Sequence, residues 1–376
     1  MRAIIRGRWL VLLTWIAVAA VLVMTAPNMG ELVREKGQLS VPDGYSSSVA
    51  AELIKEANKQ ENKENELSTV LVFYQKDGLT AEDKKEIERA VNALEKKKSD
   101  LHITNIISPF ANPELEKELI SKDKTTMLVS VSIDPDGRTA KQLTDALYEA
   151  LDGVKVEHYF TGGWMIDEDV VTSSLEGVKK TEGITIVFIL IVLLAVFRSP
   201  VAPLIPLVAV GATYAVSQSV VAFLVDKVDF PLSTFTQIFL VAVLFGIGTD
   251  YCILLLSRFK EELAKLGDRT EAIVVTYRTA GKTVLASGLA VMIGFASIGL
   301  STFKLYQSAA AVAVGVAVLL VALVTLVPFF MAVLGEKLFW PVRGKLEHGQ
   351  SRLWLAAGRF AFARPLLALI IVAAVT

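Results

Sequence analysis

Long apolar segments constrain the fold of this chain more than any other feature of its sequence. Six of them are long enough to cross a bilayer, whose hydrocarbon core takes about 20 helical residues, and they lie near 9–26, 181–198, 201–225, 234–257, 284–300 and 306–334. Hydrophobic residues make up 53% of the chain, and the mean hydropathy is +0.51. These values exclude an ordinary water-soluble globular fold. We therefore predict a helical membrane protein that crosses the bilayer several times.

The polar region between the first and second spans alternates between two periodicities. Segments with period two, typical of strands, are separated by two amphipathic helical stretches. The predicted strands are 67–74, 102–108, 125–133 and 154–160, and the predicted helices are 81–98 and 138–151, with one earlier helix at 46–62. The order βαββαβ is that of the ferredoxin-like unit. We therefore predict that an α+β domain of this type is inserted between spans one and two.

Lysine and arginine residues in the short loops predict the orientation of the chain. They cluster after the second, fourth and sixth spans, at Arg198, 258–282 and 337–352, and the N-terminus is also basic. By the positive-inside rule, these segments are cytoplasmic. The predicted organisation is a first span at 1–26, an extracytoplasmic domain at 27–180, spans two to six at 181–334, a cytoplasmic linker at 335–362 and the start of a seventh span at 363–376.

Asp250 stands in the middle of the fourth apolar segment. We expect it to be the only carboxylate within a membrane-spanning stretch of this chain. A charge in the hydrocarbon core costs roughly 2.5–3.5 kcal/mol on insertion scales, so such acids usually face a bundle interior and serve ion or proton paths. An apolar environment disfavours the ionised form, which suits a group that exchanges protons. A neutral, hydrogen-bonded aspartic acid that only packs helices is the open alternative.

The residues around Asp250 carry a family resemblance. Residues 246–263 read GxGTDYxxxLxSRxxEEL, which resembles the fourth-span signature of MmpL-type transporters, a branch of the resistance-nodulation-division superfamily. Weaker matches lie at 161–169, 280–289 and 323–328, so the resemblance covers essentially the whole chain. In that family the aspartate and the adjacent tyrosine belong to a proton relay. The resemblance assigns this role to Asp250 and Tyr251.

The resemblance also implies an activity, which is the export of hydrophobic or amphiphilic compounds driven by the proton gradient. The implied location is a bacterial cytoplasmic membrane, and the implied partners are membrane lipids and a lipid or drug substrate. No enzyme activity, cofactor or nucleic acid is expected. The family's answering Asp-Tyr pair lies on a tenth span. Residues 364–370 enter the membrane much as residues 8–14 do, so we expect this chain to be the N-terminal half of a two-repeat transporter.

Helix geometry adds further candidates around Asp250. Tyr251 lies about 100° round the helix from Asp250, so each side chain should meet a different neighbouring helix. Gly246 and Gly248 are expected to permit close helix approach beside the acid. Three hydroxyls on spans five and six either form packing seams or line the proton path, and they are Ser287, Ser297 and Ser308.

Several other functions can be weighed on their motifs. Intramembrane aspartyl proteases need Gly-x-Gly-Asp, but Thr249 intervenes here. A nucleotide-binding loop ending in Gly281-Lys282-Thr283 would need a glycine at position 276, which is a threonine. One cysteine and three scattered histidines give no metal-ligand spacing. A non-transporting membrane sensor or scaffold of the sterol-sensing type and an accessory protein translocase remain as alternatives.

Overall fold

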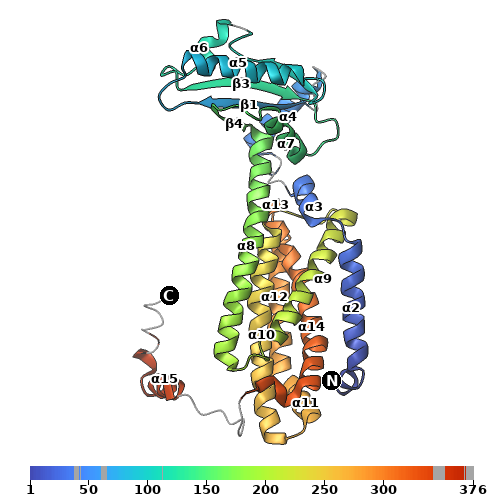
Figure 1. Ribbon diagram of the computed structural model, residues 1–376. Helices are drawn as coiled ribbons and strands as arrows, with labels where there is room; N and C mark the ends of the chain where they lie inside the picture. Colours follow the sequence, from blue (N-terminus) through green and yellow to red (C-terminus); the bar gives the residue numbers. More distant parts are fainter. Residues whose placement is uncertain are drawn as a thin grey trace.

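A helical bundle and a four-stranded sheet, joined by one long helix, make up the protein. The computed structural model describes residues 1–37, 42, 44–60, 66–111, 113–341, 352–367 and 369. Helix α8 (Gly163–Phe197) leaves the sheet and runs down the side of the bundle (Figure 1). Both the predicted fold class and the insertion of an α+β unit after the first span are confirmed.

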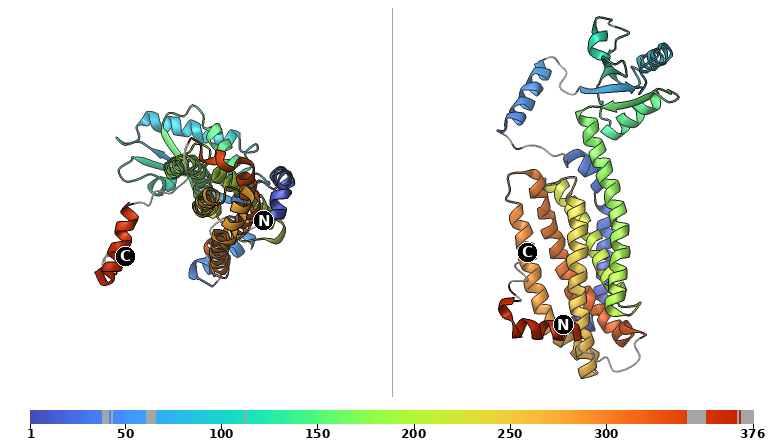
Figure 2. Two further views of the ribbon diagram at one scale, coloured as in Figure 1. Left: turned by 90° about the horizontal axis from the view of Figure 1, so that it is seen from below. Right: turned by 90° about the vertical axis from the view of Figure 1, so that its left-hand side faces the viewer.

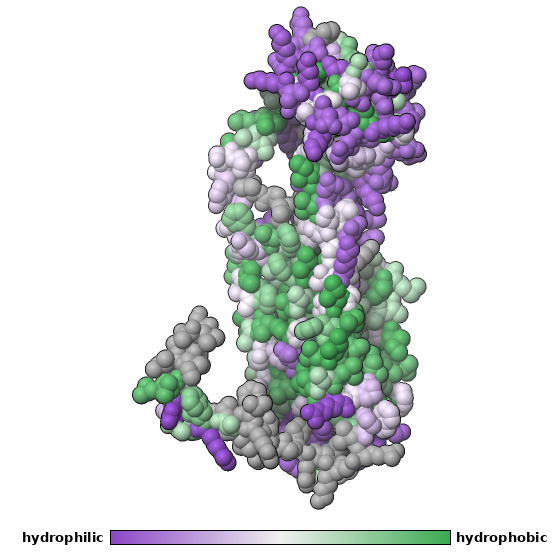
Figure 3. Space-filling model, turned by 60° about the vertical axis from the view of Figure 1, so that its left-hand side comes forward, coloured by the Kyte–Doolittle hydropathy of each residue, from purple (hydrophilic) through white to green (hydrophobic). Residues whose placement is uncertain are grey.

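Six helices of the described chain are long and apolar enough to cross a membrane. They are α2 (Arg8–Thr25), α8, α9 (Leu204–Val228), α10 (Thr236–Leu266), α12 (Ala280–Ile298) and the segment that contains α14 (Ala311–Leu334). Their apolar side chains form a continuous belt below the hydrophilic sheet domain, as Figure 3 shows for one face. The predicted seventh span falls largely outside the described residues.

Short helices complete the two ends of the bundle. At the end far from the sheet lie α1 (Arg2–Arg6) and α11 (Arg269–Arg278), which an ion pair of 2.5 Å joins through Arg2 and Glu271. Near the sheet lie α3 (Met29–Lys36) and α13 (Lys304–Gln307). Helices α4 (Ser46–Gln60) and α15 (Arg352–Ala363) stand away from the rest of the chain (Figures 1 and 2).

The sheet has the order β2-β3-β1-β4, and all neighbouring strands are antiparallel. Its strands are β1 (Leu67–Tyr74), β2 (Ile103–Ile107), β3 (Thr126–Ile133) and β4 (Glu157–Thr161). Along β3 every second side chain is buried, because successive residues of a strand point to opposite faces. The helices α5 (Ala81–Lys96) and α7 (Ala140–Ala150) bury their apolar stripes in the same core. The predicted βαββαβ unit is confirmed; the short α6 (Glu116–Leu119) lies in the loop before β3.

Both helices of the sheet domain begin at a capping box. In α5 the Thr80 hydroxyl accepts a hydrogen bond from the Asp83 backbone N–H, while the Asp83 carboxylate accepts from the Thr80 backbone. In α7 the same exchange joins Thr139 and Gln142. Each box satisfies backbone donors that the first helical turn leaves without partners.

The joint between β4 and α8 is short and stiff. Gly162 connects them at φ 157°, and a Cβ at this position would stand 2.9 Å from the Ser68 carbonyl oxygen. Only glycine fits such a close approach of two backbone segments. Helix α3 braces the first turns of α8, since Arg34 forms an ion pair of 3.0 Å with the buried Glu168. The sheet domain is therefore carried directly on a membrane helix.

Helix α10 packs between α9 and α14 through a small residue. A Cβ at Gly248 would stand 2.6 Å from Val210 Cγ2 and 3.2 Å from Leu319 Cδ1. At Gly246, two residues earlier, a Cβ would meet no described atom within 4 Å. Small residues of this kind let helices approach closely where lipid removes the hydrophobic drive for association.

Gly248→Ala should therefore destabilise the bundle, because Val210 is β-branched and has little freedom to move its methyl group away. We expect a loss of roughly 1–3 kcal/mol from overpacking. Gly246→Ala is the matched control, and it should leave stability unchanged or raise it by up to about 1 kcal/mol through helix propensity. Thermal unfolding of the chain in detergent, followed by circular dichroism, measures both. Equal midpoints for the two variants would contradict the packing described.

The two capping boxes should respond differently to pH. Hydrogen bonds from the Thr80 side chain and then from its backbone lower the pKa of Asp83 below 3.8. A carboxyl group whose pKa is lowered by folding stabilises the folded state at any pH above its unfolded-state pKa. This stabilisation is lost as the pH falls through its folded-state pKa. Thr80→Ala should therefore cost about 1 kcal/mol near neutral pH and less as Asp83 becomes protonated.

Thr139→Ala is the control, because its partner Gln142 does not titrate and its cost should stay constant with pH. Hydrogen exchange of the α5 and α7 amides, corrected for the intrinsic rates, compares the variants at pH 7 and at a pH well below 3.8, where Asp83 becomes protonated. An identical pH dependence in both variants would refute the role given to Asp83.

Candidate functional site

Asp250 lies halfway along α10, on a face of the helix that no described residue covers. It follows Thr236, the first residue of the helix, by fourteen positions, which is about 21 Å along the axis. Gly246 and Leu254, one turn to either side, are exposed like Asp250 itself. These three residues form a stripe along α10 that no described residue buries.

This exposure differs from the sequence expectation of a buried carboxylate. The neighbouring helices occupy other faces of α10: α9 and α14 lie against Gly248, and α12 lies beside Tyr251. Because Gly248 and Tyr251 point about 160° and 100° away from Asp250 round the helix, packing at those positions leaves the acid uncovered. The described chain therefore presents the carboxylate on its surface, inside the apolar belt.

Tyr251 turns toward α12. Its hydroxyl donates a hydrogen bond of 3.0 Å to Ser287 Oγ. The geometry that separates Tyr251 from Asp250 by about 100° accounts for this contact with a different helix. Tyr251 and Ser287, two of the sequence candidates, are thus brought together next to Asp250.

The remaining hydroxyl candidates lie apart from this group. Ser297 is exposed near the end of α12 and donates to the Gly294 carbonyl oxygen. Ser308 is buried before α14, with its Oγ 2.7 Å from Ser233 Oγ. Ser233 precedes Asp250 by seventeen positions, or about 25 Å for a helical rise. Neither hydroxyl touches the Asp250 group.

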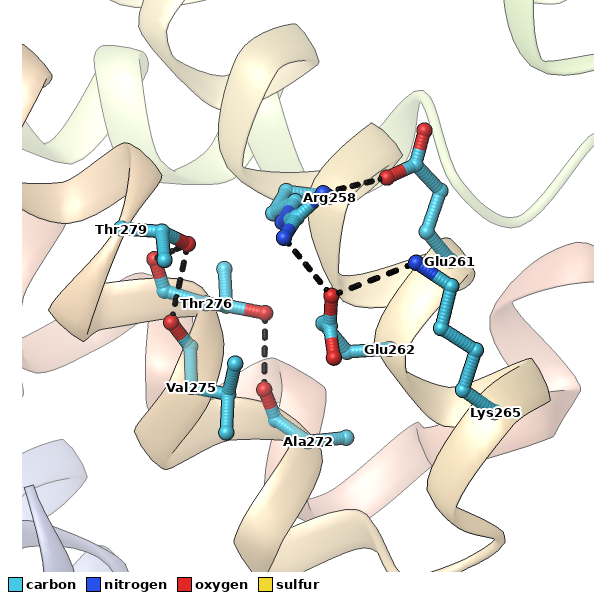
Figure 4. Close-up of polar contacts among 8 residues, drawn as sticks. All are labelled: Arg258, Glu261, Glu262, Lys265, Ala272, Val275, Thr276 and Thr279. Carbon is cyan, nitrogen blue, oxygen red and sulfur yellow. Dashed lines mark hydrogen bonds and ion pairs between the residues drawn. The ribbon is translucent and has the colours of Figure 1, made fainter.

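The end of α10 far from the sheet carries a cluster of charges (Figure 4). Arg258 forms ion pairs with Glu261 at 2.7 Å and with Glu262 at 2.8 Å, and Lys265 lies 3.7 Å from Glu262. Because Arg258 is engaged on its own helix, it anchors the end of the span. The described structure records no pairing between Arg258 and Asp250.

Sequence reasoning missed a second carboxyl group of the spans. Glu182 on α8 accepts a hydrogen bond of 2.6 Å from the Tyr214 hydroxyl on α9. The Tyr214 ring in turn lies against Phe245 on α10, with 6.1 Å between ring centroids. The available signal was a glutamate fifteen residues before the end of α8, or about 22 Å, which is too close to that end to lie outside a core about 30 Å thick.

A cavity of about 520 Å³ reaches this pair from the side of the sheet. Helices α3, α8, α9 and α10 contribute polar side chains to its wall. They are Arg34, Glu176, Glu182, Tyr214, Gln218 and Gln237, joined by Lys141 of α7. The cavity therefore carries polar surface from the base of the sheet domain into the apolar part of the bundle.

Comparison with known proteins gives one family and several relatives. The model of the MMPL family matches residues 40–368. The chain is 43% identical to "Putative membrane protein YdgH" of Bacillus subtilis over 376 residues, which cover all of this chain and 42% of that protein. The apo-petrobactin exporter of Bacillus anthracis is 26% identical over 89% of the chain and 47% of its own length.

The sulfolipid-1 exporter MmpL8 of Mycobacterium tuberculosis is 24% identical over 97% of the chain and 33% of its own length. The chain thus spans less than half the length of each of these relatives. Together with the six spans and the inserted sheet, the match over residues 40–368 shows that this chain belongs to the MMPL family of membrane transporters.

Proposed function

We propose that the chain is part of an exporter of hydrophobic or amphiphilic compounds that is driven by the proton gradient. The observation that carries this proposal is Asp250, a carboxylate about 21 Å from the start of a membrane helix. Such a residue is expensive to keep in the hydrocarbon and is by default a functional one. Tyr251 and Ser287 supply hydroxyls on the neighbouring face, which suits the passage of a proton.

The uncovered stripe of Gly246, Asp250 and Leu254 supports a relay shared with another helix. A carboxylate that remained against lipid would lack the polar partners that ionised groups need in a membrane. A second Asp-Tyr pair, expected in the part of a longer protein that this chain does not include, would supply them. The share of each relative that the chain covers is compatible with such an arrangement.

Two exporters among the relatives support the substrate class. One is named for apo-petrobactin and the other for sulfolipid-1. The sheet domain is the part of this chain that would handle such compounds outside the membrane. Its placement there, with the N-terminus in the cytoplasm, rests on the basic loops 258–282 and 337–352. We place the protein in the cytoplasmic membrane of a bacterium.

Asp250→Asn should abolish export by the complete transporter, because asparagine keeps the size of the side chain and cannot exchange a proton. Asp226→Asn is the matched control, since Asp226 is exposed near the end of α9 and pairs with Lys227. Proton-gradient-driven efflux from vesicles is the measurement, and we expect at least a tenfold loss for Asp250→Asn alone. Wild-type efflux by this variant would refute the role proposed for Asp250, whereas no efflux by the wild-type transporter would favour a non-transporting sensor.

Tyr251→Phe and Ser287→Ala each remove one hydroxyl of the pair beside Asp250. If the 3.0 Å hydrogen bond serves the relay, each change should reduce efflux to a similar extent. The double variant should then lose no more than either single variant, because residues that act through one contact are not additive. Losses that multiply in the double variant would show that the two hydroxyls act independently.

A further inference from the structure

The Glu182–Tyr214 hydrogen bond joins two membrane helices that touch little elsewhere. Among the side chains that the structure describes, it is the one hydrogen bond between α8 and α9. Its length of 2.6 Å is that of a direct O–H···O hydrogen bond. Much of α8 beyond Glu182 is exposed, including Ile184, Val187 and Phe188. This one hydrogen bond therefore contributes much of the attachment of α8 to α9 near Glu182.

Water and protons can approach Glu182 through the cavity. The cavity of about 520 Å³ extends from Asn28 and Arg34 to Glu182 and Tyr214. The charged side chains on its wall come from three helices: Arg34 from α3, Lys141 from α7, and Glu176 with Glu182 from α8. Helix α9 adds Tyr214 and Gln218, and α10 adds Gln237. Arg34 is engaged by Glu168.

Protonation of Glu182 would change the contact with Tyr214. The ionised carboxylate accepts a charge-assisted bond, which is roughly twice as strong as the neutral bond that a protonated carboxyl accepts through its carbonyl oxygen. One proton added to the carboxylate therefore loosens α8 from α9 without breaking a covalent bond. The Tyr214 ring also touches Phe245, five positions before Asp250 on α10, so the change occurs next to the helix of the relay.

We propose that Glu182 is a second proton-binding group of the transport cycle, and that its bond with Tyr214 holds α8 against α9 while the carboxyl is ionised. This inference rests on the proposed proton-driven export. It assigns the cavity beside α3 as the route by which protons reach the group from the side of the sheet domain. Loosening at Glu182 would let α8 and the attached sheet move during each cycle.

The test is infrared difference spectroscopy of the whole chain in a lipid bilayer. Exposed glutamates titrate near pH 4.3, so they stay ionised in a step between about pH 8 and pH 6. A group that serves the cycle takes up its proton in this step and adds a band of protonated carboxyl. We expect Glu182→Gln to lose a component of that band. The matched control Glu176→Gln removes an exposed carboxyl on the same cavity wall and should keep the band.

Tyr214→Phe tests the pairing even if Glu182→Gln fails to fold. This variant keeps the carboxyl and removes its hydrogen-bond donor, so the Glu182 component should move to higher wavenumber. A band that Glu182→Gln leaves intact, or a component that does not move in Tyr214→Phe, would overturn the inference.

The spectra do not depend on transport, so the two proposals fail separately. In the complete transporter, Glu182→Gln should reduce proton-driven efflux at least tenfold and flatten its pH dependence. Wild-type efflux and pH dependence in this variant would overturn the role of Glu182 while leaving that of Asp250 intact. Wild-type efflux by Asp250→Asn would overturn the role of Asp250, and no efflux by the wild-type transporter would overturn the exporter proposal itself, whatever the infrared result.

Discussion

Backbone hydrogen bonding in lipid is the constraint on which the rest of this structure depends. A backbone N–H or C=O in the hydrocarbon has no water to bind, so each crossing segment must satisfy these groups within its own helix. The backbones of α2, α9, α10, α12 and α14 meet that requirement, and many different apolar side chains would suit these helices equally well. Polar side chains at membrane depth are different, because each needs a partner that the fold must supply. Asp250, Glu182 and Tyr214 are among the positions at which this bundle carries polar groups within its spans.

Much of the fold was predictable because the spacing of apolar residues in the sequence indicates which side chains are buried. The alternation along β3 appears in the sequence as it does in the structure, and α5 begins at Ala81 as predicted. The start of α8 at Gly163 was not predictable. Its polar first turns depend on α3, which contacts them through the ion pair between Arg34 and Glu168. Span limits read from hydropathy stop at the first charge. Because the carboxylates of the second span were counted only from Gly183, Glu182 was left out.

The candidate site was predictable in its residues and not in its arrangement. A motif identifies Asp250 and Tyr251, and a helical wheel separates their directions. Neither specifies which helices cover which face of α10, because that depends on packing between segments far apart in the chain. Gly248 meets Val210 and Leu319, whereas Gly246 meets no described residue, although both glycines stand in one motif. Spacing alone likewise placed Ser308 with the other hydroxyls, and tertiary structure puts it beside Ser233.

Helix α8 gives the bundle a means of moving the sheet. Its 35 residues extend about 52 Å, and Gly162 leaves no flexible linker before β4. Two polar contacts, at Glu168 and Glu182, lie on nearly the same side of α8. These residues are fourteen positions apart, so their directions round the helix differ by only about 40°. Arg34 makes the contact at Glu168 through an ion pair, and Tyr214 makes the contact at Glu182 through a hydrogen bond. In the proposed cycle, loosening the contact at Glu182 alone would make the contact at Glu168 a pivot, so that a proton bound within the membrane would tilt the sheet domain.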